Sequence, residues 1–254
     1  MANDREQWLV LVDGSGTYYK LPRSLIERAR LPESERAAAD QALRDSLTVR
    51  RVGARTVIRP PWRDYTPAPG DVVVTLDPGG AFGDGLHAST QLCLVALEER
   101  LRPGTRVLDV GCGSGILSIA AAKLGATTVD ALDVEPLAVD VARENVARNE
   151  LTTPVRVQLG TIEPTPEFAG RYDLVVANIL TNVIVRLAPA LVAALAPEGR
   201  LLTCGITADR AGTVRDALAA AGLTAIEHRE LAGWTLVEGV RAVRAGEPGA
   251  PPAP

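Results

Sequence analysis

The chain has few aromatic residues, few histidines and cysteines, and no long apolar run. Only two of its 254 residues are Phe and two are His. Two histidines and three widely spaced cysteines (Cys93, Cys112 and Cys204) form no metal-ligand pattern, so we expect reduced thiols and no metal site. No apolar run of about 18 residues occurs and the first residues are polar. We therefore expect no membrane span, no signal peptide and a cytoplasmic location.

Hydrophobic residues make up 46% of the chain, which is enough for a sizeable core at this length. The length fits one full α/β domain and a smaller one. The segment from Arg50 to Arg63 holds five arginines (Arg50, Arg51, Arg55, Arg59 and Arg63) and no acid, but Trp62 and Tyr65 are its only neighbouring aromatic residues. We interpret it as a solvated face, and we do not expect nucleic-acid binding.

The segment VLDVGCGSGI, from Val107 to Ile116, combines a buried strand with a glycine turn. It continues directly into ILSIAAAKL, an almost wholly apolar stretch that predicts a helix packed on the sheet. A strand, a glycine turn and a helix start place backbone amides against a ligand, with no side chain in the way. The segment therefore predicts a nucleotide site, although a tight turn without a ligand has the same pattern.

The glycine spacing and two acids indicate which nucleotide is bound. Gly111, Gly113 and Gly115 form GxGxG and not the GxGxxG of a pyrophosphate site, and Asp109 precedes them. A carboxylate there repels a pyrophosphate but suits the amino group of S-adenosylmethionine. Asp133 ends the next predicted strand, where a carboxylate accepts from ribose hydroxyls, and Glu135 is a candidate to share that role.

Strands and helices alternate through the rest of the chain, which predicts a parallel sheet wound on both faces. Two consecutive strands at the end predict an antiparallel edge hairpin. We predict strands at 71–76, 107–110, 128–132, 155–158, 172–177, 200–204, 224–229 and 234–240, and helices at 91–101, 116–124, 136–149, 182–195 and 208–221.

The first 59 residues predict a small separate α+β domain. Two strands, 8–12 and 17–21, flank the turn DGSG and form a predicted hairpin. Helices at 22–29 and 32–47 and a strand at 48–58 follow. The prolines and the glycine at 60–70 predict a linker. We assign residues 71–240 to the catalytic domain. Residues 241–254 are rich in Gly, Ala and Pro, which predicts a disordered tail.

Two further segments carry candidate chemistry. Asn178 ends the predicted strand 172–177, and ligands bind outside the carboxyl ends of parallel strands. Its amide oxygen is suited to orient an attacking amine, although a turn-forming Asn is the alternative. The loop from Asp77 to Thr90 holds four glycines and also Phe82, Asp84 and His87, which favours a loop of defined conformation over a flexible linker.

Four segments, DPGGAFGDGLHAST, LDVGCGSGILSIAAAKLGA, ALDVEPLAVDVARENVARN and VVANIL, resemble the catalytic domain of the ribosomal protein L11 methyltransferase family. The resemblance covers about residues 71–240 and implies S-adenosylmethionine-dependent N-methylation of a ribosomal protein. It implies cofactor contacts at Thr90, Gly111, Asp133 and Asn178, with Phe82, Gly83 and His87 beside them.

The sequence also departs from that family. It has FGDG where the family usually has FGTG, and HAST where the family usually has two adjacent threonines. The predicted element order of residues 1–65 does not match the family's βαββαβ substrate-recognition domain, so the acceptor does not follow from the resemblance.

We predict an α/β protein with the class I S-adenosylmethionine-dependent methyltransferase fold. This fold is Rossmann-like, with a seven-stranded, mostly parallel sheet, an antiparallel edge hairpin and here a small α+β amino-terminal domain. The predicted activity is methylation of a lysine or α-amine of a protein or peptide, possible acceptors including a ribosomal protein. Asn178 orients the acceptor, and His87 and Asp84 help to remove its proton.

Three alternatives remain open at this point. The first is a methyltransferase of a small molecule or natural-product peptide, which the divergent amino-terminal part suggests. The second is a nicotinamide dehydrogenase, which the GxGxG spacing and Asp109 disfavour. The third is a non-catalytic nucleotide-binding module, which the intact loop and the Asn178 segment disfavour.

Overall fold

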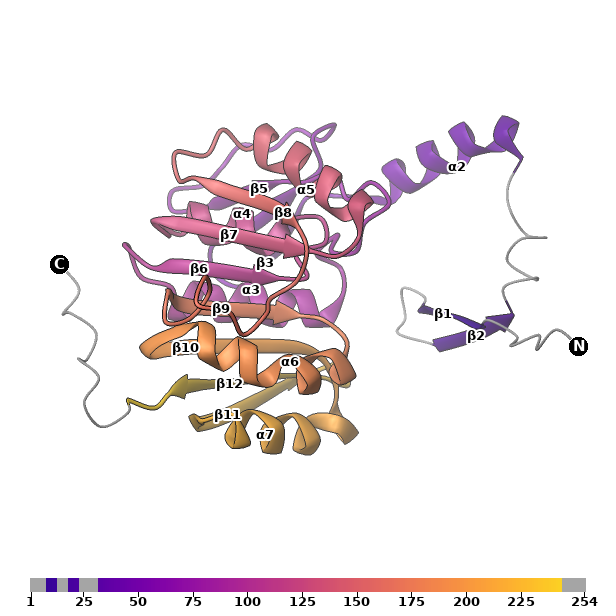
Figure 1. The fold of residues 1–254 in the computed structure, drawn as a ribbon. Coiled ribbons are helices and arrows are strands. Elements are labelled where there is room, and N and C mark those ends of the chain that lie inside the picture. Colours follow the sequence, from indigo (N-terminus) through magenta and orange to yellow (C-terminus); the bar gives the residue numbers. More distant parts are fainter. Residues whose placement is uncertain (1–7, 13–17, 23–31, 244–254) are drawn as a thin grey trace, which may run out of the picture. The chain divides into compact units, whose positions relative to one another are not determined.

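The computed structural model describes residues 8–12, 18–22 and 32–243 (Figure 1). The chain divides into two compact units, Met1–Thr48 and Val49–Pro254. In the first unit, β1 (Trp8–Val12) pairs with β2 (Tyr18–Pro22) as the predicted antiparallel hairpin, and α2 (Glu33–Ser46) follows. The predicted helix at 22–29, apart from Pro22 in β2, and the predicted tail beyond residue 243 lie outside the described residues.

The second unit contains a seven-stranded sheet in the order β11-β12-β10-β9-β6-β7-β8 (Figure 1). Every neighbouring pair is parallel except β10/β12 and β11/β12, so only β12 is reversed. This confirms the predicted mostly parallel sheet with an antiparallel edge hairpin. The strands are β6 (Arg106–Val110), β7 (Thr128–Asp133), β8 (Val155–Leu159), β9 (Tyr172–Asn178), β10 (Leu195–Thr207), β11 (Leu223–Leu231) and β12 (Trp234–Arg241).

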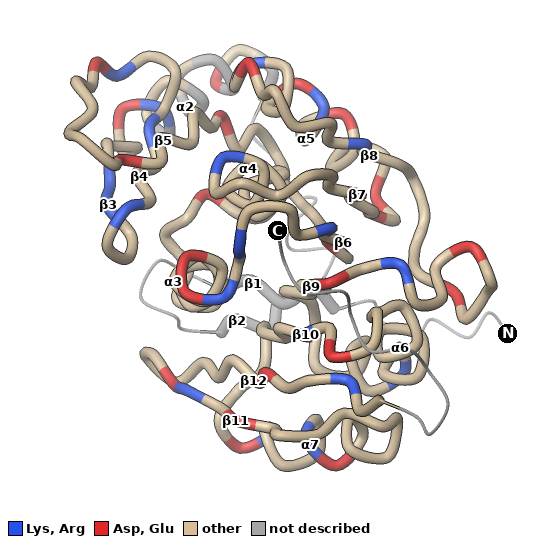
Figure 2. The backbone as a smooth tube through the Cα atoms, turned by 90° about the vertical axis from the view of Figure 1, so that its left-hand side faces the viewer, with Lys and Arg blue, Asp and Glu red and all other residues tan. Residues whose placement is uncertain are grey.

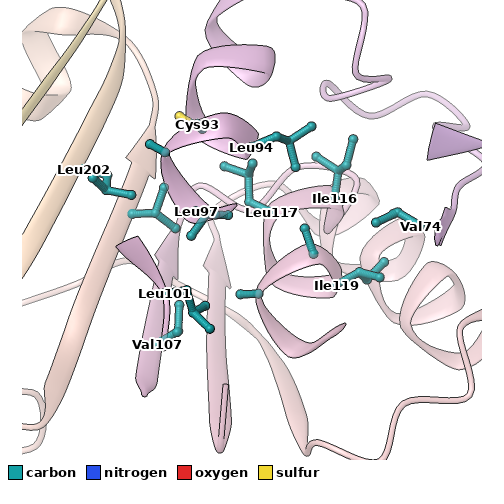
Figure 3. Packing of buried hydrophobic residues seen from close by; sticks show 14 of the residues in the cluster. Val74, Cys93, Leu94, Leu97, Leu101, Val107, Ile116, Leu117, Ile119 and Leu202 are labelled. Carbon is teal, nitrogen blue, oxygen red and sulfur yellow. The ribbon is translucent and has the colours of Figure 1, made fainter. Parts of the chain in front are cut away.

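Helices cover both faces of this sheet, because the central strands are apolar on both sides (Figure 2). On one face, Val107 and Leu202 pack with α3 and α4 in a core that Figure 3 shows from close by. On the other face, Leu108 and Leu201 pack with α6 and α7. The helices are α3 (Ala88–Arg100), α4 (Ile116–Lys123), α5 (Pro136–Arg148), α6 (Thr181–Ala194) and α7 (Ala211–Ala220), with a 3₁₀ turn at Ala208–Arg210 before α7.

Two strands replace the single strand predicted at 48–58, and they form a sheet of three with the strand predicted at 71–76. β3 (Arg50–Val52) and β4 (Thr56–Arg59) are antiparallel, and β4 is parallel to β5 (Val72–Thr75). The turn between β3 and β4 contains Gly53 with a φ of 72°, a conformation that the apolar pattern does not reveal. The Glu98 carboxylate on α3 accepts hydrogen bonds from the backbone of Ala54, Arg55 and Thr56, which holds this turn against α3.

The predicted linker at 60–70 is therefore a crossover between two neighbouring strands of one sheet. The division between units lies at residues 48/49, not between 59 and 70. Asp71 holds the crossover: it accepts from Arg51 Nη2 at 2.7 Å, from the backbone of Ala68 at 2.8 Å and from the Tyr65 hydroxyl. Within the described residues, no helix has the length and apolar character needed to cross a membrane.

Candidate active site

The glycine turn, residues 111–115, joins β6 to α4 in left-handed backbone conformations. The φ angles of Gly111, Gly113 and Gly115 are 77°, 54° and 82°. A Cβ at Gly111 would lie 2.2 Å from Ile179 Cγ2, and one at Gly113 would lie 2.5 Å from the Phe82 carbonyl oxygen. Both glycines are thus required by neighbouring protein segments as well as by backbone conformation. These contacts bring the turn against the segment after β9 and against the glycine-rich loop (residues 77–87).

Asp133 ends β7 beside the glycine turn, as the sequence predicts. Its Oδ2 accepts from the Gly113 backbone N–H at 2.8 Å, and its Oδ1 accepts from the Glu135 backbone N–H at 3.0 Å. These bonds orient the carboxylate while each oxygen retains a lone pair for a ligand hydroxyl. Glu135 itself is exposed and is the N-cap of α5.

Asp109 lies beneath the turn and has no exposed surface. The Ser118 hydroxyl on α4 donates to its Oδ2 at 2.6 Å, whereas its Oδ1 has no hydrogen-bond partner. The pKa of Asp109 is raised to about 7, chiefly by burial; the Ser118 bond opposes this shift and the nearby Asp133 carboxylate adds to it. Asp109 therefore contacts other parts of the protein in this structure, and its predicted contact with a ligand amino group stays a prediction.

Two asparagines that the sequence analysis did not identify hold the glycine-rich loop. Asn145 on α5 accepts from the Asp77 backbone N–H at 3.0 Å and donates to the carbonyls of Asp77 and Ser114. Asn149, one turn later, bonds both backbone groups of Thr75 at the end of β5. Both side chains are buried. The sequence contains a sign of this role, because Asn is unfavourable inside a predicted helix unless its side-chain amide has hydrogen-bond partners.

The loop closes over the glycine turn at its other end. The Ser114 backbone N–H donates to the Phe82 carbonyl at 2.9 Å, and the Ser114 hydroxyl donates to the Gly83 carbonyl at 2.6 Å. Gly83, with a φ of 103°, is buried, whereas the Phe82 side chain is 57% exposed. The structure thus brings the predicted loop and turn together and leaves the Phe82 ring open to a ligand.

His87 and Asp84 both make local bonds. His87 is the N-cap of α3: its Nδ1 accepts from the Ser89 backbone N–H at 3.3 Å and lies 2.7 Å from the Ser89 hydroxyl. Burial lowers the pKa of His87, although the Asp84 charge opposes this shift, and the ring is neutral at pH 7. Asp84 Oδ1 accepts from the Leu86 backbone N–H at 2.8 Å, as in an Asx turn.

Trp234, at the start of β12, is a second residue that the sequence analysis did not identify. Its ring lies edge-on to His87 with 4.5 Å between centroids, and His87 lies edge-on to Phe82 at 5.4 Å. A row of three rings therefore runs from the glycine turn to the edge hairpin. In the sequence, Trp234 follows the pair Ala232-Gly233 and indicates only a strand of a hairpin. Its place beside α3 depends on how β12 packs in the fold.

Asn178 ends β9 as predicted, next to Ile179, which contacts Gly111. The Asn178 Nδ2 donates to Thr90 Oγ1 on α3 at 3.3 Å, so its Oδ1 is the end left for a ligand. Thr90 has no exposed surface in this structure, and the cofactor contact that the resemblance implies for it stays a prediction. Leu180, the next residue but one, is 70% exposed.

Large apolar side chains are exposed on both sides of these residues. Val134 and Leu137 after β7 and Leu159 at the end of β8 flank Asp133, with exposed fractions of 61%, 58% and 59%. Leu180 follows Asn178 by two residues, and Phe82 lies beside Gly113 of the glycine turn. Exposed apolar groups around oriented polar atoms are typical of a site that a ligand covers. Among the described residues, no three His, Cys, Asp or Glu side chains form a group able to hold a metal ion.

The strand order, the single reversed strand and the glycine turn at β6 define the class I S-adenosylmethionine-dependent methyltransferase fold. Solved structures support this. A 16S rRNA methyltransferase from T. Thermophilus in complex with AdoMet and guanosine aligns with a TM-score of 0.54 at 24% identity, covering 64% of this chain and 45% of that one. At that identity the likeness shows the fold alone.

The chain belongs to the ribosomal protein L11 methyltransferase (PrmA) family, which matches residues 35–242. This confirms the predicted resemblance and extends it beyond residues 71–240. A crystal structure of ribosomal protein L11 methylase from Lactobacillus delbrueckii subsp. bulgaricus aligns with a TM-score of 0.69 at 32% identity, covering 78% of this chain and 100% of that one.

Two sequence relatives carry the same name. The ribosomal protein L11 methyltransferase of Symbiobacterium thermophilum is 48% identical over 187 residues, which cover 74% of this chain and 60% of that protein. The one of Chloroflexus aurantiacus is 43% identical over 237 residues, which cover 84% of this chain and 71% of that protein. The chain therefore spans about three fifths of the Symbiobacterium relative.

Proposed function

We propose that this protein transfers a methyl group from S-adenosylmethionine to an amine of ribosomal protein L11, the protein named in its relatives. One observation carries the proposal: Asn178, the glycine turn and Asp133 converge at one edge of the sheet. In the ligand-free structure the Asn178 amide oxygen is turned away from its Thr90 partner, so it is placed to accept from an amine N–H. An L11 acceptor is consistent with the predicted cytoplasmic location.

The residues divide into a cofactor side and an acceptor side. On the cofactor side, Asp133 accepts from ribose hydroxyls, Val134 and Leu159 cover the base, and the glycine turn, which donates to Asp133, borders the amino-acid part. When bound, S-adenosylmethionine supplies a methyl group on a sulfonium. On the acceptor side, Asn178 aligns the amine lone pair with that methyl, while Phe82 and Leu180 exclude water. The carbon–nitrogen bond forms as the carbon–sulfur bond breaks, and sulfur keeps its electron pair.

The acceptor must be a neutral amine when it attacks, since its lone pair forms the new bond. A lysine has a reference pKa of about 10.4, so one proton has to leave. We propose that the Asp84 carboxylate receives this proton, because one of its oxygens is not used by the Leu86 bond. His87 supports the site through its ring, which contacts Phe82 and Trp234, since its Nδ1 caps α3.

Mass spectrometry of purified L11 after incubation with the protein and S-adenosylmethionine tests the proposal. We expect the mass gain of one or more methyl groups, located on an amine by peptide fragmentation. Asn178→Ala should lower turnover more than it lowers affinity for S-adenosylhomocysteine. If L11 stays unmodified and methyl groups appear instead on a small molecule or another peptide, L11 is not the acceptor. The protein would still be a methyltransferase.

A further inference from the structure

We propose that a hollow at the end of α4 binds the terminal phosphate of a phosphate monoester. The hollow lies in the larger unit, where β5 packs beside α4 (Figure 2). It has a volume of about 360 Å³ and is lined by Arg55, Lys123, Pro67 and residues 70–73. Lys123 is the last residue of α4, and the first residue of that helix follows the glycine turn. The hollow is therefore at the opposite end of α4 from the predicted cofactor site.

The Lys123 ammonium has no counter-charge in contact with it. Its side chain is partly buried, and within the described residues its ammonium forms no ion pair or hydrogen bond. Burial lowers the pKa of Lys123 and the charge of Arg59 on β4 lowers it further, whereas Glu150 after α5 opposes the shift. A cation is favourable near a helix C-terminus, which explains a lysine at this position but not the further positive groups gathered around it.

Arg55 supplies a second positive group, from the turn before β4. Its Nε donates to the Gly70 carbonyl at 3.2 Å, which fixes the guanidinium against the wall of the hollow. Its terminal nitrogens, Nη1 and Nη2, form no hydrogen bond or ion pair with the part of the chain that the structure describes. A guanidinium held through one nitrogen, with two others available, is suited to bind two oxygens of one phosphate group.

Asp71 also lines the hollow, but other groups already neutralise its carboxylate. It accepts from Arg51 Nη2 at 2.7 Å, from the Ala68 backbone N–H at 2.8 Å and from the Tyr65 hydroxyl, and its side chain is only 4% exposed. The Tyr65 and Arg51 bonds hold the pKa of Asp71 below its usual range. Because Arg51 balances Asp71, the hollow keeps the two positive charges described above.

A phosphate monoester matches this excess of charge. It carries about −1.5 to −2 charges at neutral pH, whereas a carboxylate or one unit of a nucleic-acid backbone carries one. Two cations from separate segments therefore favour a terminal phosphate, because it balances both of them. Pro67 and the valines of β5 provide an apolar wall for the organic part of the ligand. The volume of the hollow is at the lower end of ligand pockets, which fits a small monoester.

NMR titration of the full chain with inorganic phosphate and with glycerol phosphate tests the inference, with sodium chloride at equal ionic strength as the reference. We expect chemical-shift changes confined to Arg55, Lys123 and residues 67–73, and a higher pKa of the Lys123 ammonium in phosphate than in chloride. Lys123→Gln and Arg55→Gln should each weaken binding by about tenfold or more, because each removes a charge-assisted hydrogen bond. Arg215→Gln, at an exposed arginine on α7, is the matched control and should bind as the wild type does.

Amide spectra recorded without phosphate identify the variants that keep the fold. Equal shifts in phosphate and in chloride, or wild-type binding by folded Lys123→Gln and Arg55→Gln, would overturn the inference. Tighter binding of malonate, or of an oligouridylate without a terminal phosphate, to the same residues would also overturn it, since the ligand would then be a dicarboxylate or a nucleic-acid backbone. These measurements need neither S-adenosylmethionine nor L11, so their outcome is independent of the proposed function.

Discussion

The buried carboxyl group of Asp109 makes the stability of the fold depend on pH. Its pKa is raised to about 7, mainly by burial, so between about pH 4 and 7 the folded chain holds a proton that the unfolded chain has released. The contribution of Asp109 therefore destabilises the fold progressively as pH rises through this window, by roughly 4 kcal/mol in total.

Asp109→Asn should remove this dependence. The difference in unfolding free energy between variant and wild type, from urea titrations at pH 5 and pH 8, should shift in favour of the variant at pH 8. His87 and the other titrating groups contribute to both proteins and cancel in the difference. Parallel pH profiles for the two proteins would show that Asp109 is ionised at all these pH values.

Asp84 is the residue where the loop departs from its family's usual threonine. As a proton acceptor near the acceptor amine, it should be sensitive to replacement by Thr or Asn. In both variants, kcat/KM for the acceptor should fall and its pH profile should shift to higher pH. The affinity for S-adenosylhomocysteine should change little. If both variants methylate the acceptor at the wild-type rate from pH 6 to 9, Asp84 is not the proton acceptor. Its role would then be only the Asx turn that it forms with Leu86.

At the scale of elements, α5 controls the glycine-rich loop through Asn145. Asn145→Ala leaves the backbone groups of Asp77 and the Ser114 carbonyl without their partner, which costs about 1–3 kcal/mol of stability for a buried site. It should also weaken cofactor binding, because loop and turn lose their common anchor. Thermal melts and calorimetric titration measure the two effects. Glu144→Ala, an exposed neighbour paired with Arg148, is the control.

A loss of stability in Asn145→Ala without any change in cofactor affinity would contradict the link between loop and pocket. The glycine-rich loop would then be held at the site by other contacts, such as the bonds of Ser114 to Phe82 and Gly83.

For the whole molecule, the sequence was sufficient for the large sheet and for the edge that carries the site. Its parallel strands are apolar runs bounded by glycines, and their carboxyl ends must meet at one edge. Gly111, Asp133 and Asn178 were placed there from spacing alone, and the structure brings them together. Their roles toward ligands stay predictions.

The parts that sequence missed depend on contacts between distant segments. The turn after Val52 is held by Glu98 on α3, so a single strand at 48–58 was wrong. The prolines at 60–70 indicated a linker, but β4 pairs in parallel with β5 across them. Trp234 and Asn145 reach the site only through folding, and the burial of Asp109 and Thr90 follows from helices packed over them. Local patterns contain none of this information.

The central claim is that the edge formed by the glycine turn, Asp133 and Asn178 binds S-adenosylmethionine. Calorimetric titration with S-adenosylhomocysteine tests it most directly, in wild type, Asp133→Ala and the Asp84→Thr control. The account predicts binding by wild type and control and an affinity weaker by about 1.5–3 kcal/mol in folded Asp133→Ala, with no binding of NAD. Equal affinity in Asp133→Ala, or binding of NAD in preference to S-adenosylhomocysteine, would contradict it.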